Sequence, residues 1–215
     1  MIRAFALSIA ALLGLAAAPA QAHPHVWVTM EAELIYAPDG KVTGLRHAWT
    51  FDDMFSEYAT QGLTQKTKGQ FTREELKPLA EENVNSLKEY SFFNHLRLDG
   101  KTAKDVIADP KDYWLDYKSD TQTLTLSFTL PLKEPVASKD LQIDIYDPEF
   151  FINFAFGEKP VVKLTGAPAT CNVTTKQPGE EQFPPVQRLD KSFQASDANA
   201  GMGAHYASKI FVKCP

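Results

Sequence analysis

Residues 25–51 constrain the fold more than any other segment, because apolar and polar side chains alternate on both sides of a tight turn. Residues 25–36 have the period of two that is typical of a half-buried strand, and residues 42–51 repeat it. Between them lie Pro38, Asp39 and Gly40, a turn in which the glycine takes a positive φ. The segment predicts an antiparallel hairpin with one buried face.

The turn also predicts which residues of the hairpin face each other. A type I turn with a bulge at Gly40 pairs Ala37 with Lys41. Continued along both strands, this register places three pairs on one face: Glu31 with His47, Trp27 with Phe51, and His25 with Asp53. A shift of one residue would bring Asp52 to that position instead, because side chains alternate between faces.

Two helices and further strands are expected after the hairpin. A short helix begins at Asp52 or Asp53, and a longer one follows Thr72, which forms a capping box with Glu75. Strands are expected at 92–98, 101–107, 113–117, 123–130, 141–146 and 161–164. This pattern predicts an α+β fold of mostly antiparallel strands, with the N-terminal hairpin and one or two helices packed on the sheet.

Residues 1–22 are typical of a secretory signal peptide. Arg3 is followed by an apolar run, and Ala20-Gln21-Ala22 has the small residues that signal peptidase accepts. The run is shorter than the roughly 20 residues of a membrane span, so the chain is not expected to span a membrane after cleavage. We expect a single periplasmic domain over residues 23–215, with a flexible loop around 177–204 that is rich in Pro, Gly, Gln and Asn.

The predicted export bears on the redox state of the two cysteines. Cys171 and Cys214 are the only pair in the chain, and an even count in an oxidising compartment favours a disulfide. The alternative is a thiol metal site, but two isolated cysteines do not match the spacing of zinc ribbons. The sequence therefore predicts a disulfide between them.

Charge and motifs exclude several functions. The chain has 22 Lys and Arg against 27 Asp and Glu, a net charge of −5, which is the wrong sign for a nucleic-acid groove. It contains no glycine-rich phosphate loop, no Gly-x-Ser-x-Gly elbow and no His-Glu-x-x-His. No enzymatic activity is expected from these patterns.

Cleavage after Ala22 would begin the chain with His23, Pro24 and His25. A terminal amine and two imidazoles within three residues suit divalent Zn, Ni, Co or Cu. Pro24 has no amide proton, so the square-planar site that uses deprotonated amides cannot form. The alternative is that this sequence is fortuitous and that His25 only ends a strand.

Interior residues add candidate metal ligands. His47, Asp53 and Asp147 join His23 and His25 as candidates, because a carboxylate beside a histidine either binds the metal or orients the ring. Each has a structural alternative: His47 as a half-buried histidine bonded to Glu31, Asp53 as a helix cap, and Asp147 as a turn cap before a proline.

Three motifs carry a resemblance to a known family. They are residues 23–27 (His-Pro-His-Val-Trp), residues 49–56 (Trp-Thr-Phe-Asp-Asp-Met-Phe-Ser) and residues 146–148 (Tyr-Asp-Pro). Together they resemble an uncharacterised bacterial periplasmic family with a domain of unknown function. Genomes label its members the periplasmic component of an uncharacterised ABC-type transport system, often near nickel/cobalt efflux permeases. Where that family usually has Glu after Phe-Asp, this chain has the shorter Asp53.

The resemblance implies a periplasmic protein that handles transition metals. The leading hypothesis is an accessory protein that captures a divalent transition metal and serves a membrane transporter. One alternative is a copper-dependent oxidative enzyme that uses an N-terminal histidine with His47. Another is a metal-free interaction module.

Overall fold

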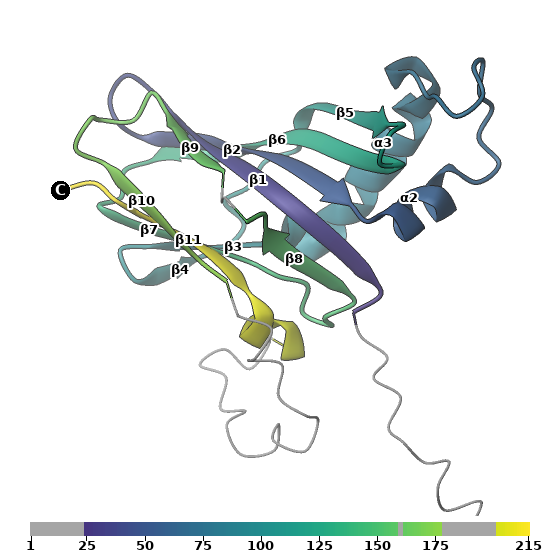
Figure 1. Cartoon of the computed structure of the whole chain (residues 1–215). Helices are drawn as coiled ribbons and strands as arrows, with labels where there is room; N and C mark the ends of the chain where they lie inside the picture. Colours follow the sequence, from purple (N-terminus) through teal and green to yellow (C-terminus); the bar gives the residue numbers. More distant parts are fainter. Residues whose placement is uncertain (1–23, 159–160, 178–200) are drawn as a thin grey trace, which may run out of the picture.

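The computed structural model describes residues 24–158, 161–177 and 201–215 (Figure 1). The predicted signal peptide, His23 and residues 178–200 of the expected loop lie outside the described residues. The strands are β1 (Val26–Tyr36), β2 (Val42–Phe51), β3 (Asn94–Leu98), β4 (Lys101–Ala103), β5 (Lys111–Lys118), β6 (Thr123–Val136), β7 (Asp140–Ile145), β8 (Ile152–Phe156), β9 (Val162–Thr165), β10 (Asn172–Lys176) and β11 (Ser208–Lys213). The helices are α2 (Asp53–Thr60), α3 (Arg73–Leu87) and the 3₁₀ segments η1 (Lys88–Phe93) and η4 (Met202–Tyr206).

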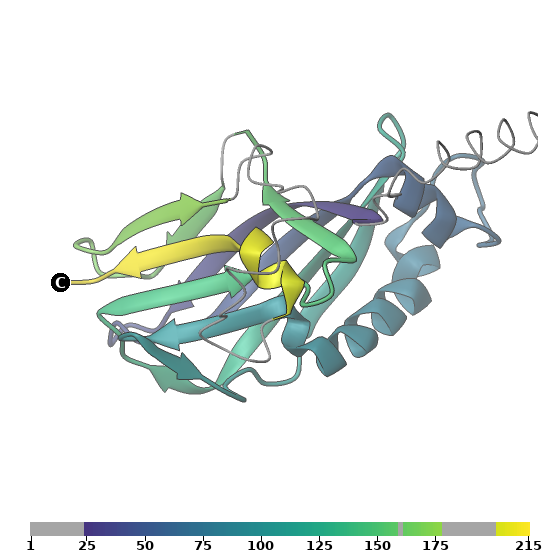
Figure 2. The same cartoon turned by 90° about the horizontal axis from the view of Figure 1, so that it is seen from below.

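Two sheets pack face to face around one core (Figures 1 and 2). The first has the order β5-β6-β2-β1-β8, and β9 also pairs with β1; both of these edge pairings are parallel. The second sheet has the order β10-β11-β7-β3-β4 and is antiparallel throughout. The largest fully buried side chains come from both sheets and from α3, among them Trp49, Phe128, Met30, Leu76, Leu96 and Leu141.

The expected α+β class is wrong, because the fold is mainly β. Within the described residues eleven strands form two layers, and only two α-helices accompany them. The helix α3 packs against β5 and lies beside the second sheet rather than forming a layer of its own (Figure 2). Three strands escaped the sequence pattern, namely β8, β10 and β11, and the last two build one edge of the second sheet.

The hairpin turn is as predicted, but the register beyond it is wrong by one residue. The Ala37 amide donates to the Lys41 carbonyl (2.8 Å), as the turn requires. A second irregularity follows, because Tyr36 pairs with Val42 whereas Ile35 pairs with Gly44. One extra residue in β2 therefore shifts the rest of the hairpin, and His47 pairs with Ala32 instead of Glu31.

The reason for the shift lies on the other side of β2. A Cβ on Gly44 would sit 2.8 Å from the carbonyl oxygen of Leu130 in β6, so only glycine allows this close approach. The pairing of β2 with β6 is also irregular between Val42 and Gly44. A glycine inside a predicted strand was the signal for this bulge.

Both helix starts follow the predicted capping. The Thr72 hydroxyl accepts from the Glu75 amide (3.2 Å) while the Glu75 carboxylate accepts from the Thr72 amide (2.8 Å), a complete capping box. At α2, Asp52 is the N-cap and Asp53 is the first helical residue. Asp52, and not Asp53, is therefore the cap of α2.

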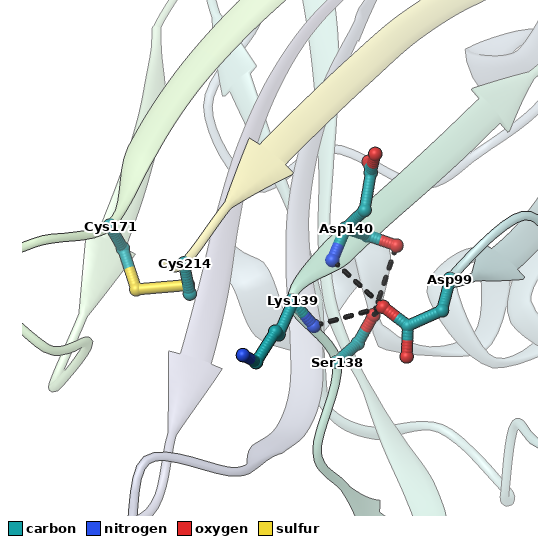
Figure 3. Close-up of a disulfide and its surroundings, with 6 residues drawn as sticks. All are labelled: Asp99, Ser138, Lys139, Asp140, Cys171 and Cys214. Atoms are coloured by element: carbon teal, nitrogen blue, oxygen red, sulfur yellow. Dashed lines mark hydrogen bonds between the residues drawn. A yellow bond between two sulfur atoms is a disulfide. The ribbon is translucent and has the colours of Figure 1, made fainter.

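The predicted disulfide joins Cys171 to Cys214, with Cα atoms 4.2 Å apart (Figure 3). These cysteines flank the paired strands β10 and β11 at the end of the second sheet. Beside them, one Asp99 carboxylate oxygen accepts from the amides of Lys139 and Asp140 (both 3.0 Å). It also accepts the hydroxyl of a neighbouring serine, and these bonds hold the pKa of Asp99 below its usual value. We call the disulfide and the Asp99 turn the stapled end.

Candidate functional site

The three motifs meet at the opposite end of the molecule, where β1 begins (Figure 1). The His25 amide donates to the Phe151 carbonyl (2.8 Å), and the Asp52 amide donates to the Trp27 carbonyl (2.9 Å). Residues 25–27, 52–54 and 147–151 thus share one network of backbone hydrogen bonds, and we call them the motif end. The sequence predicted this meeting for the first two segments only.

Asp52 fastens the hairpin to α2. One carboxylate oxygen accepts from the Trp27 amide and the other from the Phe55 amide, both at 2.8 Å. The shifted register places Asp52 opposite Trp27, so the same residue ends β2 and caps the helix. With both oxygens used in this way, Asp52 acts as a structural residue.

Asp53 differs from its neighbour. It is exposed in the first turn of α2, and one carboxylate oxygen accepts from the Met54 amide (2.9 Å). A carboxylate at a helix N-terminus is stabilised by the helix dipole. Asp53 directly follows Asp52, whose carboxylate accepts from the Trp27 amide, and its own side chain is exposed. A ligand at the motif end can therefore reach Asp53.

Asp147 organises the turn before β8. Its side chain is only 4% exposed and accepts from the amides of Glu149 (3.0 Å), Phe151 (2.9 Å) and Ile152 (3.0 Å). The turn also holds Phe150 at a φ of 57°, a conformation that L residues rarely adopt. These contacts match the structural alternative for Asp147, a turn cap.

The Asp147 turn positions an aromatic surface beneath His25. The rings of His25 and Phe151 are stacked, with centroids 4.8 Å apart and an angle of 30°. His25 is exposed, as are Phe151 (45%) and Trp27 (47%). The motif end therefore presents an imidazole on an uncovered apolar surface, with Met54 exposed nearby in α2.

His47 lies inside the molecule, between the two sheets. It is 1% exposed, and its Nε2 lies 3.1 Å from the side-chain oxygen of Asn94 in β3. The Asn94 amide nitrogen donates to the Phe92 carbonyl (2.6 Å), so the Asn94 oxygen must accept and Nε2 must carry the proton. Burial lowers the pKa of His47 to about 4, although the bond to Asn94 acts in the opposite direction.

The expected contact between His47 and Glu31 is absent because of the register shift. Glu31 pairs with Ala48 and is exposed, whereas His47 faces the core between Trp49 and Phe128. His47 is therefore more deeply buried than the half-buried position predicted from the sequence. A metal could reach this ring only if the sandwich opened.

A short segment that the sequence pattern assigned to a flexible loop packs against the Asp147 turn. The Gly203 amide donates to the Pro148 carbonyl (3.1 Å), and the rings of Phe150 and Tyr206 stack with centroids 4.0 Å apart. A Cβ on Gly203 would clash with the Asp147 carbonyl oxygen. The Gly-Met-Gly sequence before His205 was the available signal for this close approach.

The described residues contain no group of three or more His, Cys, Asp or Glu side chains that could hold a metal. Of the five predicted ligands, His25, Asp53 and Asp147 come to the motif end, and His47 does not. His23 lies outside the described residues. Of the predicted ligands, the exposed ones at this end are therefore His25 and Asp53, and Glu149 of the Asp147 turn is a further exposed carboxylate.

The fold and the site define a small two-sheet β protein. At one end, turns capped by aspartate side chains position a histidine and aromatic rings. The chain belongs to the family described as protein of unknown function (DUF1007), whose model matches residues 8–214. This confirms the resemblance to a family with a domain of unknown function. No curated protein matches the chain. Among the described helices, none has the length and apolar character needed to cross a membrane.

Proposed function

We propose that this protein is a periplasmic accessory protein that binds a divalent transition metal at the motif end and serves a membrane transporter. The observation that carries the proposal is the placement of His25. It is exposed at the start of β1, its backbone is fixed to Phe151, and it stands two residues after His23. The proposal requires His23 to lie beside His25.

The donor set fits borderline metals if His23 completes it. The terminal amine and imidazole of His23, the imidazole of His25 and the carboxylate of Asp53 would supply the nitrogen and oxygen ligands that Zn, Co, Ni and Cu accept. In this proposal the metal is cargo. An exposed site with few ligands suits transfer, because a partner can replace the ligands one at a time. Asp52 and Asp147 are not ligands in this proposal; their hydrogen bonds to backbone amides position the segments that carry the ligands.

Two features support an exported location. Residues 1–22 have the pattern of a signal peptide, and Cys171 and Cys214 form a disulfide. Disulfides persist in oxidising compartments such as the bacterial periplasm. Export would also create the free amine of His23, so cleavage and metal binding are linked in this proposal.

The alternatives differ in what supports them. A copper-dependent oxidative enzyme would need His47 as a further ligand, and the burial of that ring and its bond to Asn94 speak against it. A metal-free interaction module is favoured by the exposed Trp27 and Phe151, since uncovered aromatic side chains are common at protein interfaces. Metal affinity distinguishes this module from the main proposal.

The test is a competition titration with Zn(II), Co(II), Ni(II) and Cu(II) on protein that begins at His23. We expect binding to weaken about tenfold or more in His25→Ala and in protein with one extra N-terminal Met, and less in Asp53→Asn. His205→Ala, an exposed histidine outside the proposed set, is the matched control and should bind as the parent does.

The pH dependence gives a second readout. Histidine ligands must be neutral, so protons compete with the metal and affinity should fall as the pH is lowered from 7 to 5. Equal affinity in the parent, His25→Ala and the Met-extended protein, or no change with pH, would contradict a site built on His23 and His25. In that case the interaction module would be the better proposal.

A further inference from the structure

A cavity of about 400 Å³ lies away from the metal ligands proposed above, at the edge of the second sheet. Strand β4 ends at Ala103, and the chain then crosses to the first sheet, where the Lys133 amide donates to the Val106 carbonyl (2.8 Å). This crossing leaves the start of β3, at Asn94 and His95, paired with β7 on one side and without a β4 partner on the other. The cavity occupies that place, and η1 closes its other side.

One wall of the cavity is a pair of stacked rings. His95 and Tyr146 have centroids 4.1 Å apart and planes at 19°. Tyr146 is the first residue of the Tyr-Asp-Pro motif, whose aspartate holds the turn of the motif end. The rest of the lining includes Val106 and Ile107, whose apolar side chains are half-buried. A flat group would therefore find a ring surface with apolar side chains beside it.

Positively charged side chains also line the cavity. Lys88, Lys104 and Lys133 line the cavity from three different segments, and Asp105 is the one acid among the lining residues. Lys88 forms an ion pair with Asp109 (3.1 Å), whereas Lys104 and Lys133 form none with the described residues. A local excess of cations in a chain with a net charge of −5 favours an anionic ligand.

The backbone beside the cavity is held in an unusual conformation. Ser91, Phe92 and Phe93 have φ values of 51°, 54° and 55°, three left-handed residues in succession. The Asn94 side chain donates to the Phe92 carbonyl, and the Tyr146 amide donates to the Phe93 carbonyl (3.2 Å). Such conformations cluster at ligand sites, where the surrounding structure enforces them. Two of these residues, Ser91 and Phe92, are among those that line the cavity.

We propose that this cavity binds a small organic carboxylate with a flat, apolar body. Its carboxylate would lie between Lys104 and Lys133, and its body would lie against the His95–Tyr146 pair. The volume matches that of small-molecule sites. A bare inorganic anion would be too small to contact both the lysines and the rings. The site is separate from the proposed metal ligands, so either proposal can fail without the other.

The test uses three probes on the disulfide-bonded chain that begins at His23: benzoate, benzamide and inorganic phosphate. We expect benzoate to bind at roughly millimolar concentration and to shift the NMR signals of His95 and Tyr146. Benzamide, which has the same ring without the charge, should bind several-fold more weakly. Phosphate, which has the charge without the ring, should leave both signals unchanged.

Variants test which lysines bind the carboxylate of the ligand. Lys104→Gln with Lys133→Gln should weaken benzoate binding several-fold, whereas Lys101→Gln with Lys139→Gln, two exposed lysines outside the cavity, should not. The exposed positions make loss of folding a minor concern, and near-UV circular dichroism checks it. Equal binding of benzoate and benzamide, equal loss in both double variants, or no shift at His95 would each overturn the proposal.

Discussion

The two ends of the sandwich both use one aspartate to hold a turn, but they differ in what surrounds it. At the stapled end, the exposed Asp99 accepts two amides and one hydroxyl beside a disulfide. At the motif end, the buried Asp147 accepts three amides, with no disulfide beside it. The stapled end is fixed covalently, whereas the motif end depends on hydrogen bonds to the carboxylates of Asp52 and Asp147.

The difference shows how a surface can be rigid and open together. At the motif end, η4 packs against the Asp147 turn and leaves Phe151 45% exposed. Backbone hydrogen bonds to Asp52 and Asp147 fix this end from behind and leave His25, Trp27 and Phe151 exposed. A site that exchanges a ligand with a partner needs this combination, because its contacting groups must be both accessible and well placed.

Removal of the disulfide should have the largest effect on stability. Cys171→Ser with Cys214→Ser frees a loop with a sequence separation of 43. The chain-entropy model gives a loss of about 4 kcal/mol in the free energy of unfolding, measurable by urea denaturation. Metal affinity should be unchanged in the folded variant, since the motif end lies at the far end of the strands. A parallel loss of metal affinity would break the distinction between the two ends.

Replacement of Asp147 should have the next largest effect. Asp147→Ala leaves three backbone amides without their acceptor in a buried turn, and the loss should be about 3 kcal/mol. Asp99→Ala is the matched control and should cost less, because water can replace its carboxylate at an exposed turn. Only the Asp147 variant should also weaken metal binding, since it releases Phe151 beneath His25. Equal costs for both variants would show that burial is not what distinguishes the ends.

The features of the fold that have local causes could be predicted from the sequence. The turn at Gly40, the capping box at Thr72, the cap at Asp52 or Asp53 and the disulfide all follow from nearby residues or from residue counts, and all are present. The register of the hairpin was missed because the extra residue beside Gly44 is imposed by a third strand. Pairing with a third strand, here β6, cannot be inferred from the hairpin segment alone.

The candidate site shows the same limit. Asp147 was considered as a turn cap from its place before a proline, and this alternative agrees with its contacts. The burial of His47 was underestimated, since its partner Asn94 comes from the other sheet. The fold class was wrong for a related reason. Strands β10 and β11 complete the second layer through pairing that their short sequences do not signal.

The smallest effect concerns the layer between the two ends, where His47 links the sheets. Burial lowers the pKa of His47 in the folded protein to about 4, whereas an unfolded histidine titrates near 6.5. Between these values the unfolded chain binds more protons than the folded one. The contribution of neutral His47 is therefore complete above about pH 6.5 and is lost progressively as the pH falls toward 4.

Between pH 7 and pH 5 this linkage should lower the free energy of unfolding by about 2 kcal/mol. His47→Gln does not titrate and keeps an amide that can donate to Asn94, so its stability should fall less over the same range in urea denaturation. An NMR titration of the His47 ring in the parent protein checks the cause directly, even if the variant folds poorly. A ring that titrates near 6.5 would place the acid sensitivity elsewhere.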